Sequence, residues 1–383
     1  MNRLTILALI YLLVAASCSK DSQTPEFDPA DQSQQLIGKT PSEQITFDQI
    51  EMISSKIEEV KEMRGSRYQR SNCTETVFVP DDYPTIQEAI FAVCENGNVF
   101  VRSGVYQESP GIDTDGIFIK AIGEVTLKGG FGMGANNVSI HGFSIDNSFS
   151  EFSRVGIACG PGFNGFDLKH NTIYSSGTSP VGYPFGHIGI YLEYSDDNRI
   201  VQNDISGNME VGIYIDAIRL DFPGSSGHPF GGSTNNVISN NTITGIFGNL
   251  DVFYAGTGIQ LRGDTDNTTV NGNTVNSSNG WGISLWSFAN LGKECDHNTV
   301  KNNAVEDHSS NGIEVYFGGS DNTIGPNNES NANGQAGIVL YDYSADNHVF
   351  NNTALNNGFC DLVNLGTNNT FKKNTTDCDL GVD

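Results

Sequence analysis

Apolar and polar positions recur in one outline between residues 156 and 349, although the letters differ from copy to copy. Each copy opens on Gly-Ile, places an apolar residue two positions later, and then has an asparagine followed by another aliphatic residue. The Gly-Ile pairs begin at residues 156, 189, 212, 258, 282, 312 and 337, at intervals of 23 to 46 residues. Such a period suits one coil of a β-solenoid made from two or three short strands. We therefore predict stacked parallel strands around an aliphatic interior.

The recurring asparagines belong to the same architecture. Equivalent residues of adjacent coils lie about 4.8 Å apart, directly above one another. Asparagine side chains at turns can then bond the backbone of their neighbours, while glycine suits the tightest corners. The asparagines expected to stack in this way are Asn171, Asn198, Asn236, Asn267, Asn298, Asn322, Asn347 and Asn369.

Two segments before the repeats show a different periodicity. Apolar residues at spacings of three and four predict an amphipathic helix over residues 46–70. Residues 74–108, TETVFVPDDYPTIQEAIFAVCENGNVFVRSGVYQE, then read as strand, short helix and strand. This segment resembles the opening of pectin-lyase-like right-handed parallel β-helices, whose helix caps the end of the core. The resemblance implies an all-β, right-handed parallel β-helix solenoid with an N-terminal capping helix over residues 71–383.

The first 45 residues indicate export. One basic residue precedes an apolar run too short for a membrane span, which is typical of a signal peptide. The exit Ala-Ala-Ser-Cys at 15–18 resembles a bacterial lipoprotein cleavage site, which implies lipidation of Cys18; a plain signal peptide cut near Ser17 is the alternative. We expect a signal peptide over residues 1–18, a flexible tether over 19–45, and a lipid anchor in the bacterial outer membrane.

Charge and cysteines narrow the classes further. The formal net charge of −25 argues against nucleic acid as a partner, because phosphates would be repelled. With Cys18 set aside, six cysteines remain in an oxidising compartment. Closeness in sequence favours the pairs Cys73–Cys94 and Cys360–Cys378 near the two ends of the repeats. No Cys-x-x-Cys or His-x-His spacing supports a zinc or copper site.

Side chains that alternate with the buried positions should form two columns on the outer face of the Gly-Ile strands. The first column is Tyr191, Tyr214, Gln260, Ser284, Glu314 and Val339. The second is Glu193, Asp216, Arg262, Trp286, Tyr316 and Tyr341. Aromatic faces suit sugar rings, and carboxylates and arginine bond hydroxyl or carboxylate groups. The alternative is that the aromatic side chains only stiffen the sheet.

The irregular intervals place extra residues at 175–187, 218–234, 245–256 and 287–297, and loops released from a rigid scaffold often carry function. These loops flank the coils that hold the columns. As catalytic candidates we consider His187, His228, Arg219, Tyr254, Arg262 and Lys293; as substrate-binding candidates, Tyr191, Glu193, Tyr214, Asp216, Trp286 and Tyr316.

These residue types suggest β-elimination at a uronate unit of an acidic glycan. An arginine would neutralise the uronate, and a tyrosine, histidine or lysine would remove the C5 proton. A glycoside hydrolase using Glu193 and Asp216 is one alternative, and a glycan-binding surface lipoprotein without catalysis is another. We expect a monomer. The sequence identifies no cofactor, although Asp264 and Asp266 leave Ca²⁺ binding open.

Overall fold

The computed structural model describes residues 41–67, 73–177, 187–217, 231–248, 256–289 and 292–382. The predicted signal peptide, its lipidation site Cys18 and most of the tether lie outside these residues. The first described element is helix α3 (Pro41–Arg67), which begins five residues before the predicted helical segment. Among the described residues, no helix is long and apolar enough to cross a membrane.

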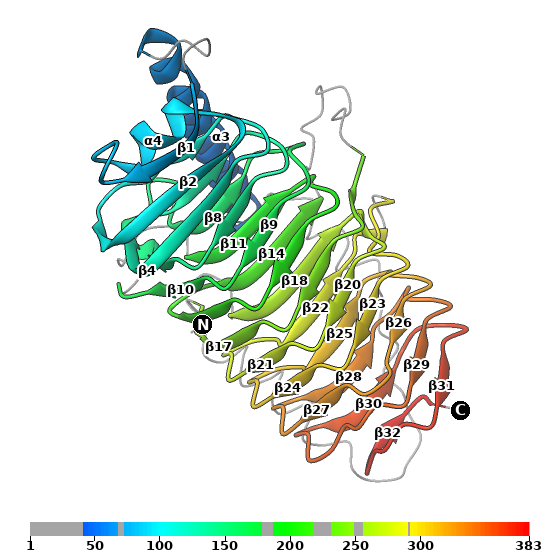
Figure 1. Ribbon diagram of the computed structural model, residues 1–383. Coiled ribbons are helices and arrows are strands. Elements are labelled where there is room, and N and C mark those ends of the chain that lie inside the picture. Colours follow the sequence, from blue (N-terminus) through cyan, green and yellow to red (C-terminus); the bar gives the residue numbers. More distant parts are fainter. Residues whose placement is uncertain are drawn as a thin grey trace, which may run out of the picture. The chain divides into compact units, whose positions relative to one another are not determined.

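The rest of the chain is a stack of parallel strands (Figure 1). One face is an 11-stranded sheet, formed by β3 (Gly111–Ile112), β5 (Phe131–Met133), β8 (Val155–Cys159), β11 (Ile188–Glu193), β14 (Val211–Ala217), β18 (Thr257–Gly263), β22 (Ile283–Trp286), β25 (Ile313–Tyr316), β28 (Ala336–Leu340), β30 (Cys360–Asn364) and β32 (Asp379–Leu380). We call it sheet B.

The other strands form a 19-stranded sheet, sheet A, and one short pair. Sheet A contains β1 (Thr74–Val79), β2 (Val93–Tyr106), β4 (Phe118–Lys128), β6 (Ser139–His141), β7 (Ser144–Asp146), β9 (Asp167–Lys169), β10 (Thr172–Ser175), β12 (Arg199–Val201), β13 (Asp204–Gly207), β16 (Val237–Ser239), β17 (Thr242–Ile246), β20 (Thr269–Asn271), β21 (Thr274–Asn276), β23 (Thr299–Lys301), β24 (Ala304–Glu306), β26 (Thr323–Ile324), β27 (Glu329–Asn331), β29 (His348–Phe350) and β31 (Thr370–Lys372). The short pair is β15 (Ser233–Thr234) with β19 (Thr265–Asp266).

A typical coil contributes one strand to sheet B and two to sheet A, as β11, β12 and β13 do. The predicted parallel β-helix is therefore confirmed. The isoleucines of the Gly-Ile pairs stack in register through the interior and are at most 1% exposed. Burying one such side chain contributes about 2 kcal/mol of hydrophobic free energy. They are Ile157, Ile190, Ile213, Ile259, Ile283, Ile313 and Ile338.

Buried asparagines form ladders along the stack. Asn241 is one rung: its Nδ2 donates to Oδ1 of Asn273 at 3.0 Å, and its Oδ1 accepts from the backbone N–H of Asn203 at 2.9 Å. The prediction that Asn267 belongs to the ladder is wrong. In that coil Thr268 occupies the ladder site, and its backbone N–H donates to Oδ1 of Asn298. Asn267 instead holds the preceding left-handed turn position, with φ of 50°.

The two helices cover different parts of the solenoid. Helix α4 (Ile86–Ala92) begins at Thr85, whose hydroxyl accepts from the N–H of Glu88 at 3.1 Å, and its apolar residues join the main core. Helix α3 packs outside the solenoid instead. Its Ile53 and Ile57 form one cluster with outward-facing residues of β8, β11 and β14. Arg64 anchors its C-terminal end through an ion pair with Asp113 at 2.7 Å.

Both predicted disulfides are present, Cys73–Cys94 and Cys360–Cys378. They lie near the two ends of the coil stack. Cys159 and Cys295 are buried free thiols, and burial raises the pKa of each. Such thiols are poorly reactive, because the thiolate is the nucleophilic form.

Candidate functional site

The outer face of sheet B carries the two predicted columns in register. Strand pairing places Tyr191 beside Tyr214, then Gln260, Ser284, Glu314 and Val339. It likewise places Glu193 beside Asp216, then Arg262, Trp286 and Tyr316. The alignment expected from the repeat is therefore confirmed across five consecutive coils.

The expectation that these columns face solvent is wrong for the whole first column, whose residues are at most 7% exposed, and for the N-terminal end of the second. Tyr191, Glu193, Tyr214 and Asp216 are each at most 5% exposed. The two tyrosine rings pack edge to face, with centroids 5.4 Å apart, in the same cluster as Ile53 of helix α3. Sequence periodicity could not reveal that a helix from outside the repeats covers this part of the face. These four side chains are therefore not part of an open surface groove.

Asp216 and Arg262 form a two-bonded ion pair. Arg262 donates from Nε to Oδ1 at 3.0 Å and from one terminal nitrogen to Oδ2 at 2.9 Å. The guanidinium also lies 5.4 Å from the ring centroid of Tyr214. Because both oxygens of Asp216 accept from Arg262, this carboxylate is poorly placed as half of a hydrolytic pair with Glu193. The Arg262 side chain is 15% exposed, so it reaches the edge of the open face with its charge offset by Asp216.

Further along the same face, the carboxyl group of Glu314 is buried in a polar cluster. Its two oxygens accept from the Ser284 hydroxyl at 2.8 Å and the Asn311 amide at 2.9 Å. The same amide nitrogen donates to the Tyr341 hydroxyl at 3.0 Å. Burial raises the pKa of Glu314 to about 7, and the two hydrogen bonds offset only part of that rise. A carboxyl group tuned near neutrality is suited to proton transfer.

Aromatic residues surround Glu314 and form what we call the aromatic strip. The Tyr316 ring lies 5.1 Å from that of Trp286 and 5.0 Å from that of Tyr341, centroid to centroid. Tyr343 at its far end is 55% exposed. Burial raises the pKa of Tyr316 and of Tyr341, so both phenols keep their protons at neutral pH. The strip consists of Trp286, Phe288, Tyr316, Phe317, Tyr341 and Tyr343.

Two other catalytic candidates lie apart from this cluster. His187 precedes β11, and its Nδ1 is 2.8 Å from the Ser175 hydroxyl. Burial lowers its pKa to about 4. The β11–β14–β18 register puts it at the opposite end of the strands from Arg262, roughly 15–20 Å away. Lys293 forms an ion pair with Asp264, so its ammonium group already has a carboxylate partner.

His228, Arg219 and Tyr254 lie outside the described residues. The Ca²⁺ option at Asp264 and Asp266 gains no support: Lys293 occupies the first carboxylate, and Oδ1 of the second accepts from the Asp296 N–H at 2.8 Å. The described residues contain no group of three or more side chains arranged to hold a metal.

Glu314 is the functional candidate that sequence reasoning missed. It stands in the first column, where a carboxylate on a supposedly solvated face attracts no attention. The sequence did contain a signal for Glu314: it lies one coil from Ser284 and two residues before Tyr316 of the aromatic second column. Its burial and raised pKa required the tertiary structure.

Comparison with known proteins identifies the family of this fold. No curated protein matches the sequence. The family described as the right handed beta helix region matches residues 111–291 and 291–376. The chain belongs to the right-handed β-helix family.

Solved structures with a similar right-handed β-helix include the periplasmic alginate epimerase AlgG, at 13% identity, covering 79% of this chain and 84% of that one, with a TM-score of 0.46. The A-module of the Azotobacter vinelandii mannuronan C-5 epimerase AlgE4 is 14% identical, with coverages of 84% and 95% and a TM-score of 0.46. The Dettilon tailspike protein (gp208) is 14% identical, with coverages of 78% and 62% and a TM-score of 0.50. At such identities these likenesses bear on the fold alone.

Proposed function

We propose that this right-handed β-helix is a carbohydrate-active enzyme that cleaves a uronate-containing glycan by β-elimination on the outer face of sheet B. The observation that carries the proposal is the polar cluster of Glu314, Asn311 and Tyr341 beside the aromatic strip, in which burial raises the pKa of Glu314 to about 7. Glu314 lies one coil from Trp286, on the same face as Arg262.

In the proposed reaction a sugar ring stacks on the aromatic strip near Trp286, with Arg262 one coil away on one side and Glu314 one coil away on the other. The guanidinium of Arg262 neutralises the uronate carboxylate, which makes the C5 proton more acidic. A base removes that proton, its electron pair forms the C4=C5 double bond, and the C4–O bond breaks. The Tyr341 phenol, which shares the Asn311 amide with the buried Glu314, gives its proton to the departing oxygen.

His228 and Tyr254 of the predicted loops are the proposed bases, and Arg219 is a second candidate for binding the uronate carboxylate. We also propose that the protein is exported and held at the outer membrane by a lipid on Cys18, which would place it where extracellular polysaccharide is met.

The test is to mix the purified domain, without its signal peptide, with a panel of uronate polymers and record the ultraviolet absorbance of the new double bond. We expect Tyr341→Phe to lower kcat/KM about 100-fold, because the group that protonates the departing oxygen is lost. Trp286→Ala should weaken binding about tenfold, mainly through KM. Glu329→Gln and Tyr174→Ala, which change outward-facing residues of sheet A, serve as matched controls and should retain activity.

The other readouts decide between the alternatives. New reducing ends without absorbance would replace elimination with hydrolysis. Binding that depends on Trp286 and Tyr316, with no product of either kind, would establish a non-catalytic glycan-binding protein; the row of aromatic rings favours this second candidate over hydrolysis.

A further inference from the structure

A separate outward-facing column of side chains runs along sheet A, on strands that take no part in the sheet B site. In five consecutive strands, β1, β2, β4, β6 and β9, the register stacks Phe78, Phe100, Lys120, His141 and Lys169. Two aromatic rings are thus followed by three nitrogen-bearing side chains in successive coils. Residues nearly a hundred positions apart in sequence meet only because the chain is coiled.

The aromatic part of this column is continuous. The ring centroids of Phe78 and Phe100 are 5.4 Å apart, and Phe118 extends the row at 6.4 Å from Phe100. The edge of the His141 ring packs against Phe118, with centroids 4.9 Å apart. All four rings are partly exposed. They therefore offer apolar faces to a ligand on the surface of sheet A.

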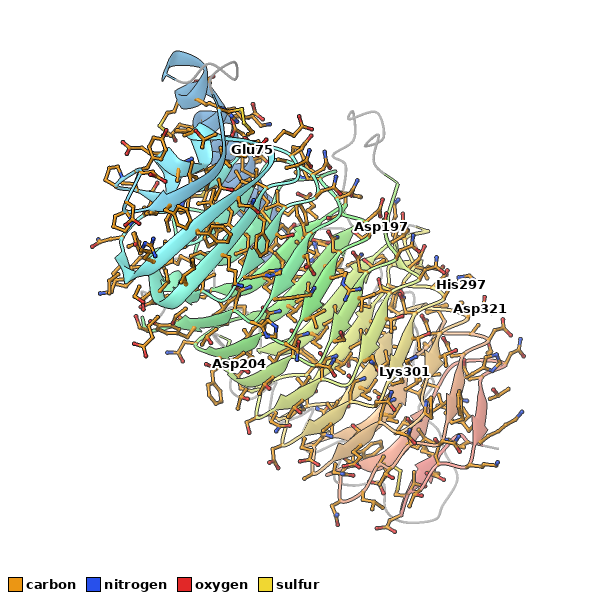
Figure 2. All side chains as sticks on the ribbon, in the orientation of Figure 1. Glu75, Asp197, Asp204, His297, Lys301 and Asp321 are labelled. Carbon is orange, nitrogen blue, oxygen red and sulfur yellow. A yellow bond between two sulfur atoms is a disulfide. The ribbon has the colours of Figure 1, made fainter. Side chains whose placement is uncertain are left out.

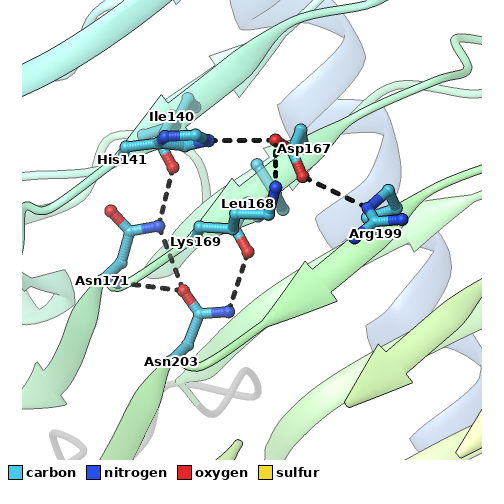
Figure 3. A network of polar contacts seen from close by, with 8 residues as sticks. All are labelled: Ile140, His141, Asp167, Leu168, Lys169, Asn171, Arg199 and Asn203. Atoms are coloured by element: carbon cyan, nitrogen blue, oxygen red, sulfur yellow. Dashed lines mark hydrogen bonds and ion pairs between the residues drawn. The ribbon is translucent and has the colours of Figure 1, made fainter. Parts of the chain in front are cut away.

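Next to these rings, Asp167 organises a cluster of basic side chains (Figure 3). Its Oδ2 is 2.8 Å from Nζ of Lys169 and 3.2 Å from Nε2 of His141, while its Oδ1 is 3.7 Å from Nε of Arg199. Burial lowers the pKa of His141, which favours the neutral form of that ring. We call Lys120, His141, Lys169 and Arg199 the basic patch.

The basic patch has more positive charge than Asp167 neutralises. Arg199 is 59% exposed and meets Asp167 only at the longest of the three distances. Lys120 is exposed as well, and within the described part of the chain no carboxylate lies within ion-pair distance of it. Such a cluster is unexpected by charge alone in a protein with 20 lysines and arginines against 45 acidic residues.

We propose that the basic patch, with the adjoining row Phe78, Phe100 and Phe118, is a second binding site, and that its ligand is the carboxylate-bearing strand of an acidic polysaccharide. Lys120 and Lys169 stand two coils apart in one column, about 10 Å, which is comparable to the length of two sugar units. A glycan chain lying along the stack would therefore present every second carboxylate to a lysine, while its ring faces meet the phenylalanines.

Nucleic acid shares the anionic charge and the stacking faces, but the surrounding charge disfavours it. A phosphate backbone would run across the rest of a surface that is −25 overall. A glycan of a few units fits within the patch. This site does not depend on catalysis at sheet B, so the two proposals can fail separately.

The experiment measures binding of a defined uronate oligosaccharide and of a neutral glucan oligomer by calorimetry. It uses the protein carrying Trp286→Ala and Tyr316→Ala, in which the sheet B face is impaired. Within that background, Lys120→Glu with Lys169→Glu should weaken uronate binding about tenfold or more, because two charge-assisted contacts are reversed. Lys120→Ala with Arg199→Ala, a milder pair of changes at exposed positions, should weaken it in the same direction.

Lys301 provides the matched control. It lies in the same outward column of sheet A, four coils beyond Lys169, and is labelled in Figure 2. Lys301→Glu makes the same charge change and should leave affinity within about twofold, since it lies outside the patch. Equal losses in both proteins, unchanged affinity in the patch variants, equal binding of the neutral glucan, or equal binding of a single-stranded oligonucleotide would each overturn the proposal.

Discussion

At the scale of single residues, the hydrogen-bonding partners of the buried carboxyl groups distinguish them from one another. Glu314 is 3% exposed and accepts two hydrogen bonds from neutral side chains. Asp216 is also buried, yet a guanidinium bonds both of its oxygens. Only a buried carboxyl group without a cationic partner gains by keeping its proton, and Glu314 is in that situation.

The raised pKa of Glu314 predicts a pH dependence of stability. The folded protein keeps this proton up to about pH 7, whereas the unfolded chain releases it near the ordinary value of 4.5. The contribution is complete below the unfolded pKa and is lost as the pH rises through the folded pKa. Urea unfolding should therefore show that Glu314→Gln stabilises the protein relative to wild type by up to about 3 kcal/mol more at pH 8 than at pH 5.

Comparing wild type with Glu314→Gln removes the contribution of buried histidines to the pH dependence of stability. Burial lowers the pKa of His187 and of His308 to about 4, so these residues make the folded state more stable as the pH rises towards 6.5. Both proteins share those histidines, and the difference between them isolates Glu314. A difference that stays constant from about pH 5 to pH 8 would contradict the raised pKa.

At the scale of the element, one coil is held to the next by the asparagine ladder as well as by strand pairing. The side chain of Asn241 bonds Asn273, Asn203 and the carbonyl oxygen of Ile200. Every one of these groups is buried, so no water replaces a lost partner. The ladder therefore converts a turn position into a specific contact between coils.

Asn241→Ala should lower the free energy of unfolding by about 3 kcal/mol, because it leaves buried hydrogen-bond donors and acceptors on both neighbouring coils without partners. Asn271→Ala is the matched control. That residue is partly exposed in β20, where its side chain accepts from Asn302 at 2.7 Å, and its loss should cost less than about 1 kcal/mol. Urea denaturation measures both. Equal losses would mean that the ladder contributes little beyond an ordinary surface contact.

At the scale of the whole solenoid, stability is a sum over coils and their interfaces, so the ends are its weakest parts. The last strand of each sheet, β31 in sheet A and β32 in sheet B, pairs on one side only, and Cys360–Cys378 links β30 to the chain just before β32. Ala336, Val339 and Val363 form a small cluster there, with Tyr341 of the aromatic strip packed against it.

Replacing Cys360 and Cys378 with serine should therefore release the last coil without unfolding the centre. Removal of a cross-link across 18 residues costs about 3 kcal/mol by chain entropy. Hydrogen exchange should accelerate in β30–β32 and leave β14 and β18 as protected as in wild type. Faster exchange throughout the solenoid would show instead that its coils unfold as one cooperative unit.

The sequence by itself determined the coil. The alternation of apolar and polar residues along a strand, and the repeat of glycine and asparagine along a coil, are local patterns that do not depend on how the coils stack. It predicted the register of the outward columns, the buried isoleucines and both disulfides. Tertiary structure alone decided which outward residues are open: helix α3 covers Tyr191 and Tyr214, and burial tunes Glu314. It also decided that Thr268 occupies the ladder site beside Asn267, and that Lys120 and Arg199 share one patch. Burial and charge clustering depend on segments far apart in the chain, and no local pattern records them.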